Sequence, residues 1–495
     1  MMTSTLFSED SLLSSSPAML IGGQWTRTEA ARPVTNPSTG KQIATVPEGT
    51  AAHLEETLSV ARHAQKNWAR KTYAERGAVL ESVVRIVSEH HEELAQIVVA
   101  EQGKTITEAR GEIGGVKAFF DFAISQKYRN VGELVAPSAH GRQLIVREEP
   151  IGIVAAIIPW NFPAAIFARK VAPALMAGNA IVLKPSEETP LSAIAMARVC
   201  QLAGVPDGLI SVITGPGRVI GDAIVRHPSV GMVTVTGSTR AGRQILAATA
   251  EKVIPVSLEL GGKAPVIVFD DADLELAVQQ AFEARFWNCG QVCTCNERTY
   301  VQRGVYDEFV RRFVAKVRDL KVGDPLDDTS QMGPKVSQAE WDKVKSFVDG
   351  AVSAGAHLEI GGGKPEGMED SDGFWFAPTV LTNVTNDMDI VQQEVFGPVL
   401  PIIPFDDYDQ VIEWANSTEY GLTAYVYTES MRTALAATDD LEFGEVYLNQ
   451  TGPEQVQGFH TGWKLSGLGG DDGAHGFERY LRRKTVYLDY AKPSR

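Results

Sequence analysis

Three of the four cysteines lie within seven consecutive residues, in the segment NCGQVCTC at 288–295. The spacing of Cys289, Cys293 and Cys295 matches neither a paired-cysteine zinc site nor a redox disulfide motif, and the histidines offer no metal set beside it. A thiolate is a strong nucleophile whose reactivity depends on its surroundings. The pattern therefore indicates either a nucleophilic thiol or a group of small buried residues where a helix begins.

One carboxylate and one amide stand in two further motifs. Glu259 lies between two leucines in VSLELGGK (256–263), at the end of an expected strand, where burial would raise its pKa and suit it to act as a general base. Asn161 lies in PWNFP (159–163), where two prolines fix the backbone and the amide could donate to a developing oxyanion. The alternatives are a solvated strand residue and a rigid turn with a structural asparagine.

Two glycine-containing segments are candidates for binding phosphate. Thr236, Gly237 and Ser238 end an apolar strand and open an expected helix, whose free N–H groups and dipole suit a pyrophosphate. A second segment, GPGRVIG, contains Gly217 and Gly221 and resembles the GxGxxG pattern with one residue too many. The two segments together predict a site for nucleotide phosphates.

A lysine and a glutamate follow another apolar strand. Lys184 and Glu187 stand in LKPSEETP, at a strand end where a ribose could lie. An acidic side chain at this position accepts ribose hydroxyls and repels a 2′-phosphate. The pair therefore favours NAD over NADP, although use of both is not excluded.

The elements that must position these residues form two alternating sets. From residue 151 onward, short apolar strands alternate with helices, and a second such set begins near 297, which predicts mainly parallel sheets covered on both faces. A hairpin signal at 132–150 and a terminal strand at 484–490 lie outside both sets. A length of 495 residues agrees with about three domains.

Composition excludes several classes of protein. Hydrophobic residues make up 44% and charged residues 22%, which is a globular composition, and the net charge of −16 argues against binding to nucleic acid or anionic membranes. The first twenty residues carry no basic side chain, so we interpret 1–20 as a flexible leader and not a signal peptide. The apolar run 151–168 is interrupted by Pro159, Asn161 and Pro163, so no membrane span is expected. These features favour a cytoplasmic protein.

Taken together, the ordered motifs resemble those of the aldehyde dehydrogenase superfamily, from about residue 20 to the C-terminus. The step of 34 residues from Glu259 to Cys293 is usual in that family. The resemblance implies an α/β fold with a Rossmann-type cofactor domain (21–131 and 152–261), an α/β catalytic domain (262–477) and a small β oligomerisation element (132–151 and 478–495). It also implies a homodimer or homotetramer.

The resemblance implies a mechanism as well. Cys293 attacks the aldehyde carbon, the Asn161 amide and the Cys293 backbone N–H stabilise the oxyanion, and hydride passes to NAD. Water activated by Glu259 then hydrolyses the thioester. Acyl transfer to coenzyme A is the chemical rival, and the intact glutamate argues for hydrolysis. The implied cofactor contacts are Trp160, Lys184, Glu187, Gly217, Gly221, Thr236, Gly237, Ser238, Glu394 and Phe396, and no metal is implied.

The C-terminal segments GFHTGWKLSG (458–467) and GGDDGAHG (469–476) look like those of the lactaldehyde and glycolaldehyde dehydrogenase branch. In that branch a glutamate six residues before the histidine lines the substrate site. The branch has asparagine after the nucleophile, where this chain has threonine. The implied substrate contacts are Arg169, Trp287, Thr294, Glu454, Phe459 and His460. The rings of Trp287, Trp160 and Phe459 are expected to form an aromatic wall.

Three functions stay open at this point. The first is oxidation of a small hydroxylated aldehyde, because polar groups suit a hydroxylated substrate. The second is oxidation of a semialdehyde or a sugar-derived aldehyde, with a substrate carboxylate meeting Arg169. The third is a catalytically silent protein of the same fold, against which the intact Cys293, Glu259 and Asn161 argue. Under oxidation, Cys295 could form a disulfide with Cys293.

Overall fold

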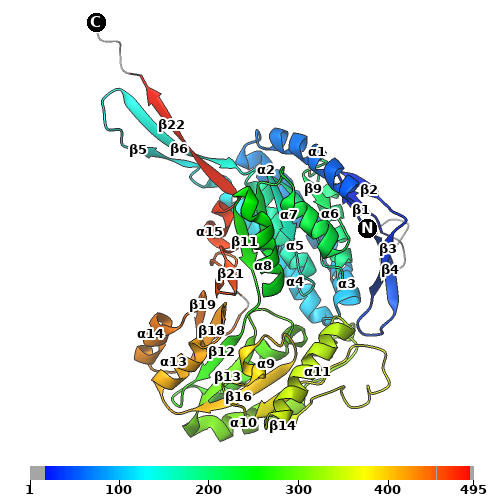
Figure 1. The fold of residues 1–495 in the computed structure, drawn as a ribbon, viewed down its shortest axis with the longest axis vertical. Helices are drawn as coiled ribbons and strands as arrows, with labels where there is room; N and C mark the ends of the chain where they lie inside the picture. The colour runs from blue at the N-terminus through cyan, green and yellow to red at the C-terminus, as the bar shows by residue number, and fades with distance from the viewer. Residues whose placement is uncertain (1–16, 453, 491–495) are drawn as a thin grey trace.

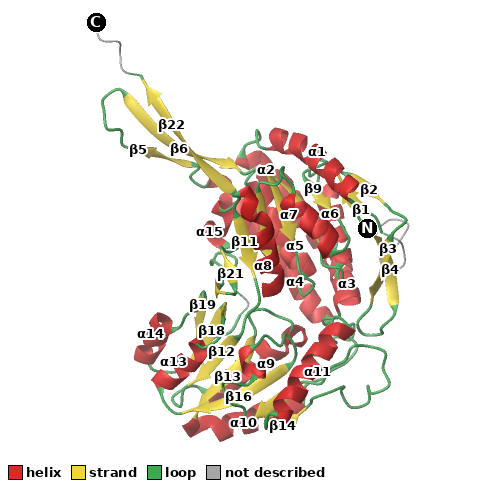
Figure 2. Cartoon of the chain, viewed as in Figure 1, coloured by secondary structure: helices red, strands yellow, loops and turns green. Residues whose placement is uncertain are grey.

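The computed structural model describes residues 17–452 and 454–490, which form two α/β units and a projecting β arm (Figure 1). Figure 2 shows that each unit is built around a sheet with helices packed against it. Among these described residues, no helix is both long and apolar enough to cross a bilayer. The described part of the chain likewise contains no group of three or more His, Cys, Asp or Glu side chains that could hold a metal ion.

The first unit contains an eight-stranded sheet whose five central strands are parallel. Its strands, in spatial order, are β2 (Gln24–Thr26), β1 (Met19–Ile21), β9 (Ile210–Val212), β8 (Ala180–Lys184), β7 (Ile153–Ile157), β10 (Met232–Thr236), β11 (Val256–Glu259) and β21 (Gly467–Leu468). The helices of this unit are α1 (Ala51–Trp68), α2 (Tyr73–Glu89), α3 (His91–Gln102), α4 (Ile106–Ser125), α5 (Pro163–Met176), α6 (Pro190–Leu202), α7 (Asp222–Arg226) and α8 (Thr239–Thr249). Strands β7 and β8 are buried almost throughout because helices cover both faces of the sheet.

The second unit contains a seven-stranded sheet. Its strands, in spatial order, are β14 (His357–Ile360), β15 (Thr379–Thr382), β16 (Val399–Phe405), β13 (Asn296–Gln302), β12 (Ala264–Val268), β18 (Thr423–Tyr427) and β19 (Glu445–Leu448). The helices are α9 (Leu274–Phe286), α10 (Arg303–Arg318), α11 (Gln338–Ser353), α12 (Asp389–Gln392), α13 (Tyr408–Asn416) and α14 (Met431–Asp440). All pairs except β14 with β15 are parallel, as the alternating pattern predicts.

A three-stranded arm extends away from both units (Figure 1). Strands β5 (Gly132–Val135) and β6 (Arg142–Pro150) form the predicted hairpin, and β22 (Leu481–Asp489) pairs antiparallel with β6. The predicted terminal strand therefore pairs outside its own neighbourhood, as expected. Smaller pieces are the hairpin β3 (Ala31–Thr35) with β4 (Gln42–Pro47), the pair β17 (Tyr420–Gly421) with β20 (Trp463–Lys464), and α15 (Gly473–Glu478).

Two of the expected boundaries differ from the structure. Met19 and Leu20, which we assigned to the leader, belong to β1 and are buried, because this apolar strand pairs with β2 and β9. Residues 467–468, assigned to the catalytic unit, form β21 and pair with β11 of the other sheet. The rest of the leader up to residue 16, and residues 491–495 of the oligomerisation element, lie outside the described residues.

Candidate active site

The carboxyl ends of four parallel strands bring most of the predicted residues to one edge of the first sheet. Ile157, four residues before Asn161, pairs with Lys184 on one side and Val235 on the other, and Thr236 pairs with Glu259. Ligands of open parallel sheets bind outside such carboxyl ends. The register therefore places the predicted phosphate, ribose and general-base residues beside one another.

The cysteine segment follows α9 through a strained turn. Asn288 and Cys289 have φ values of 50° and 55°, in the left-handed region that few residues adopt without support. Glu108 accepts a hydrogen bond from the Asn288 N–H at 2.6 Å, and Gln102 donates to the Asn288 side chain at 2.9 Å. These bonds hold the turn so that Cys293 is only half-buried while the neighbouring cysteines are buried.

Asn161 is buried beside this turn. Its Nδ2 donates to the carbonyl of Gln291 at 3.0 Å, and a second N–H on the same nitrogen is available to an oxyanion. Its carbonyl accepts a hydrogen bond from Lys104 Nζ at 2.8 Å. Lys104 in turn forms a fully buried ion pair with Glu112, 2.6 Å apart, and Glu112 accepts the N–H of Ala164 at the start of α5. The main-chain carbonyl of Asn161 is therefore held by Lys104, and Glu112 of α4 holds that lysine.

Glu259 is buried, and neither of its carboxylate oxygens has a hydrogen-bond partner among the described residues. Burial raises its pKa to about 8, while the nearby His460 acts in the opposite direction. A buried carboxylate with free lone pairs can take a proton from a water molecule. The environment of Glu259 is thus the one we expected of a general base.

His460 lies between the two sheets, at the centre of the predicted site. Its Nε2 is 3.5 Å from Glu259 Oε2, its Nδ1 is 3.0 Å from Glu445 Oε1, and its interaction with the Cys293 thiol lowers the pKa of that thiol. Only 2% of the side chain is exposed. The structure therefore places His460 against the predicted nucleophile and base, whereas the sequence pattern assigned it only to the substrate contacts.

Arg169 does not present a free charge to the site. Its guanidinium donates to both carboxylate oxygens of Asp472 at 3.1 and 2.5 Å, and to Glu454 at 2.6 Å. Two carboxylates therefore neutralise this buried cation. That a substrate carboxylate meets Arg169 stays a prediction, and such a carboxylate would have to compete with Glu454 and Asp472 for the guanidinium.

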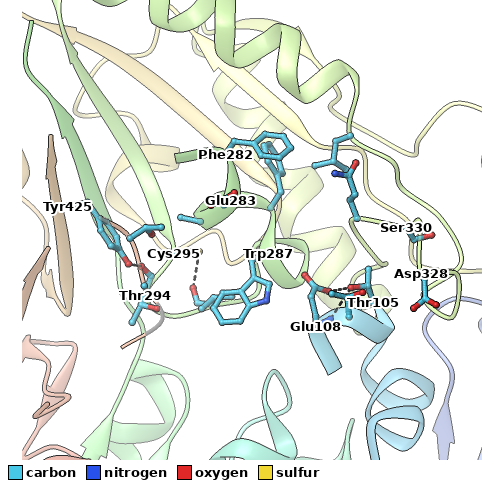
Figure 3. A pocket seen from close by; sticks show the side chains of 18 residues that line it. Thr105, Glu108, Phe282, Glu283, Trp287, Thr294, Cys295, Asp328, Ser330 and Tyr425 are labelled. Atoms are coloured by element: carbon cyan, nitrogen blue, oxygen red, sulfur yellow. Dashed lines mark hydrogen bonds between the residues drawn. The ribbon is translucent and has the colours of Figure 1, made fainter. Parts of the chain in front are cut away.

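A cavity of about 440 Å³ lies beside the cysteine segment, and Figure 3 shows Trp287 at its centre with Thr294 on one side and Glu108 on the other. Thr294 is held there through its carbonyl, which accepts the Tyr425 hydroxyl at 2.5 Å. Three acidic and several hydroxyl side chains line the cavity, and over the described residues its lining contains no basic side chain. The cavity is lined by Val292, Thr294 and Cys295 of the cysteine segment, and its lining does not include Cys293, Glu259 or Asn161.

The expected aromatic wall is divided among three separate ring pairs. Trp287 packs on Phe162, with centroids 5.4 Å apart, Trp160 packs edge-on against Phe396 at 5.3 Å, and Phe459 contacts His475. Trp160 and Phe396 therefore lie together on the predicted cofactor side, whereas Trp287 lines the cavity. Among the described residues, no ring pair joins Trp287, Trp160 and Phe459 to one another.

The predicted ribose residues have a partner that the sequence did not indicate. Glu187 Oε2 is 2.5 Å from Arg32 on β3, and its Oε1 accepts the Gly217 N–H at 2.8 Å. Lys184 is buried, and burial lowers its pKa to about 8 while Glu187 opposes that shift. A cation therefore stands beside the carboxylate that we expected to repel a 2′-phosphate.

The glycine segment with one residue too many forms a π-helical turn over Gly217–Gly221. A π-helical turn contains one residue more than an α-helical turn, which accounts for the departure from the GxGxxG spacing. The turn lies against Lys184, since a side-chain carbon added at Gly221 would come within 3.6 Å of that lysine. Gly237, before the N-cap residue Ser238 of α8, has open space where a side chain would stand, so the residues present fit a phosphate group.

Glu394 and Phe396 lie in the loop between α12 and β16 of the second unit. Phe396 has a φ of 56°, and Glu297 holds this strained residue by accepting its N–H at 2.8 Å. Burial alone would raise the pKa of Glu297, but Lys263 and Arg285 lower it to about 2. Glu394 accepts the Gly262 N–H at 2.9 Å, next to the segment that carries Glu259.

Several positioning residues were not predicted. Glu112 lies in α4 and Glu445 in β19, whose periodicity shows nothing unusual, and Lys104 lies in the loop between α3 and α4. The only local signal is the charged lysine within EQGKT (101–105), a segment that proves to be buried. A lysine that is buried needs a paired carboxylate, but the pattern alone does not show which one.

The remaining cysteines have no reactive environment. Burial raises the pKa of Cys295 to about 12, and its sulfur accepts a hydrogen bond from Arg285 at 3.0 Å. Burial likewise raises the pKa of Cys289 to about 12. All four cysteines are free, so a bond between Cys293 and Cys295 remains a hypothesis that applies only under oxidation.

Comparison with known proteins agrees with this geometry. The Aldehyde dehydrogenase family model matches residues 25–486. The chain is 59% identical to a 3,6-anhydro-alpha-L-galactose dehydrogenase of Streptomyces coelicolor, over 99% of this chain and 100% of that protein. It is 40% identical to a lactaldehyde dehydrogenase of Escherichia coli, over 95% and 98% of the two chains.

A solved structure described as 3,6-anhydro-L-galactose dehydrogenase in complex with NAP superimposes with a TM-score of 0.94 at 45% identity, covering 96% of this chain and 100% of the other. The similarity extends over nearly the whole of each protein. This chain belongs to the aldehyde dehydrogenase family and is an NAD(P)-dependent oxidoreductase.

Proposed function

We propose that this enzyme oxidises a sugar-derived hydroxyaldehyde of the 3,6-anhydro-L-galactose type to the carboxylic acid. The observation that carries this proposal is the 59% identity, over 99% of the chain, to a 3,6-anhydro-alpha-L-galactose dehydrogenase. The neutralised Arg169 argues against a semialdehyde, whose carboxylate would find no free cation there.

In the proposed reaction the Cys293 thiolate attacks the aldehyde carbon and forms a thiohemiacetal. The Asn161 amide and the Cys293 backbone N–H donate to the oxyanion. Bound NAD(P) supplies the hydride acceptor, which Lys184, Glu187, the start of α8, Glu394 and Phe396 would hold. Glu259 then takes a proton from the water that hydrolyses the thioester. Residues 21–131 and 152–261 would carry the cofactor, and 262–466 the thiol.

A small hydroxyaldehyde such as lactaldehyde is the second candidate. The 40% identity to a lactaldehyde dehydrogenase and the branch-like segments around His460 favour it. Both candidate substrates carry a hydroxyl next to the aldehyde. They differ in size, because the anhydro sugar is the larger molecule. This chain has Thr294 after the proposed nucleophile, where the lactaldehyde dehydrogenase branch has asparagine. Thr294 also lines the cavity beside the cysteine segment.

A substrate panel tests the proposal. NADH or NADPH formation would be measured with 3,6-anhydro-L-galactose, lactaldehyde, glycolaldehyde and succinic semialdehyde. We expect kcat/KM for the anhydro sugar to exceed that for lactaldehyde by on the order of tenfold or more, since each unmet hydroxyl contact costs binding in the transition state. A preference for succinic semialdehyde would contradict the proposal, and no turnover with any aldehyde would indicate a catalytically silent protein.

The pairing of Glu187 with Arg32 predicts how the cofactor is selected. Replacing Glu187 with glutamine should shift the ratio of kcat/KM values toward NADP by about tenfold, because a carboxylate that repels the 2′-phosphate is removed. Replacing Arg32 with alanine should shift the ratio toward NAD. The matched control is Arg85→Ala, an exposed arginine on α2 that pairs with Glu89. An unchanged ratio in both test variants would refute this role.

We propose that the β arm joins copies of the chain into a homodimer or homotetramer. Large apolar side chains are exposed on it, including Leu134 (69%), Tyr487 (76%) and Tyr490 (68%). The outer edges of β5 and β22 are unpaired among the described residues, and open sheet edges of this kind bind further strands. Sedimentation of the intact chain measures the oligomeric state, and a monomer would contradict the proposal.

A further inference from the structure

His460 is held in place by contacts from both sheets. Its backbone N–H and carbonyl exchange hydrogen bonds with Asp471 at 3.0 and 2.9 Å. Glu445 is the first residue of the edge strand β19, and Glu259 is the last residue of β11. An imidazole fixed on both sides has little freedom to rotate, so its two nitrogens face constant partners.

The contacts assign different tasks to the two nitrogens. Glu445 Oε1, at 3.0 Å, is an acceptor, so Nδ1 carries a hydrogen and donates it. Nε2 is then the nitrogen that can accept a proton, and it lies on the side of Glu259 and the Cys293 thiol. A carboxylate that orients an imidazole beside a nucleophile is the arrangement that activates nucleophiles in other enzymes.

The groups around His460 stabilise the imidazolium that forms when Nε2 accepts a proton. The charged and titratable groups that face it from every packed element are Glu259, Cys293, Glu445, Glu454, Arg169, Lys170, Asp471 and Asp472. Arg169 and Lys170 are each paired with carboxylates. Burial alone would lower the pKa of His460, but the charge of Glu259 and the interactions with Cys293 and Glu445 raise that pKa well above its ordinary value.

The interaction with His460 also shifts the pKa of the Cys293 thiol, in the downward direction. Burial raises the pKa of Cys293, while the hydrogen bond to His460 and its charge lower it. The other three thiols have no such partner, and burial raises the pKa of each of them. The imidazole therefore distinguishes one thiol from the rest.

We propose that Glu445, His460 and Cys293 form a proton relay that generates the thiolate, a role that rests on Cys293 being the nucleophile as proposed above. The S–H bond of Cys293 breaks, and its proton binds His460 Nε2, while Glu445 stabilises the resulting imidazolium through Nδ1–H. The sulfur electron pair then forms the bond to the aldehyde carbon. When water cleaves the thioester, the thiolate is released next to the same imidazolium, and the pair is restored.

This arrangement separates two proton transfers that one base would otherwise share. Glu259 is left to deprotonate the hydrolytic water, while His460 serves the thiol. Glu445 is then a positioning residue, since it acts through His460. His460 touches the reacting sulfur and is a catalytic residue in this scheme.

The relay is tested by the pH dependence of Cys293 alkylation in the intact enzyme without substrate. Iodoacetamide labelling would be followed by peptide mass spectrometry, so that labelling of Cys293 is read separately from the other cysteines. We expect Glu445→Gln to shift the midpoint of alkylation upward by about one pH unit, which lowers the rate about tenfold at pH values below the midpoint. His460→Asn should shift it at least as far, and Glu445→Asp should restore most of the wild-type profile.

The matched control is Glu442→Gln, an exposed glutamate three residues earlier that pairs with Lys464. It should leave the midpoint unchanged. A midpoint that does not move in either Glu445→Gln or His460→Asn would overturn the relay, and melting curves would show that both variants are folded. Because no aldehyde is used, this failure is distinct from failure of the proposed function, which would appear as turnover by a Cys293→Ala enzyme.

Discussion

Replacing Cys293 with alanine should reduce aldehyde oxidation by on the order of 10⁴-fold or more, because no other group can form the covalent bond to the aldehyde carbon. The neighbouring thiols cannot substitute for it. Cys289 and Cys295 are buried, and burial raises the pKa of both to about 12, so neither forms a thiolate near neutral pH. Steady-state formation of NADH or NADPH at saturating aldehyde measures the loss.

Two measurements show whether a loss of activity in the Cys293→Ala variant could instead come from misfolding. Cofactor binding, followed by fluorescence or calorimetry, should be unchanged, because the alanine removes only the sulfur of a half-buried residue. Cys200→Ala is the matched control, since Cys200 is buried in α6 of the cofactor-binding unit, and it should retain wild-type turnover. Substantial turnover by Cys293→Ala would show that the nucleophile has been assigned wrongly.

Replacing Glu259 with glutamine should produce the second large effect, on hydrolysis and not on hydride transfer. We expect a burst of about one NADH per subunit followed by a steady-state rate lowered about 10²- to 10⁴-fold, because the acyl-enzyme forms but its water is not activated. Rapid-mixing absorbance separates the two phases. Loss of the burst together with the steady state would instead assign Glu259 to an earlier step.

The pH dependence provides an independent check on the same residue. Burial raises the pKa of Glu259 to about 8, and a general base acts in its deprotonated form. The wild-type steady-state rate should therefore rise as pH increases through about 8, and this rise should disappear in Glu259→Gln. Glu251→Gln, at an exposed position in the turn after α8, is the control and should keep the wild-type profile. A wild-type rate that does not change between pH 7 and 9 would contradict the raised pKa of a working base.

Several parts of the site could be predicted because they are local in the chain. Asn161 stands between two prolines, Glu259 precedes a glycine pair, and Cys293 lies in a segment rich in small residues. Each of these motifs ends a strand or begins a turn, and the ends of parallel strands meet at one edge of a sheet. The α/β class followed for the same reason, since alternation of apolar strands with helices is itself a property of the linear chain.

The boundaries and the pairing of charges could not be predicted in this way. Met19 and Leu20 resemble the end of a polar leader, yet they are buried because β1 finds partners in β2 and β9. Arg169 resembles a binding site for an anion, yet Glu454 and Asp472 neutralise it across some 300 residues of chain. Periodicity reports whether a residue is buried but not which partner it meets.

The sequence by itself determined the family, the fold class and the candidate nucleophile, base and oxyanion donor, because each depends on short motifs and their order. Only the tertiary structure decided which charged partners those groups meet and in which direction their pKa values shift. It brings His460 to 3.5 Å from Glu259 and 3.0 Å from Glu445, although the three residues come from a loop and from two different sheets. Electrostatic interaction depends on distance through space and on burial, and neither quantity can be read along the chain.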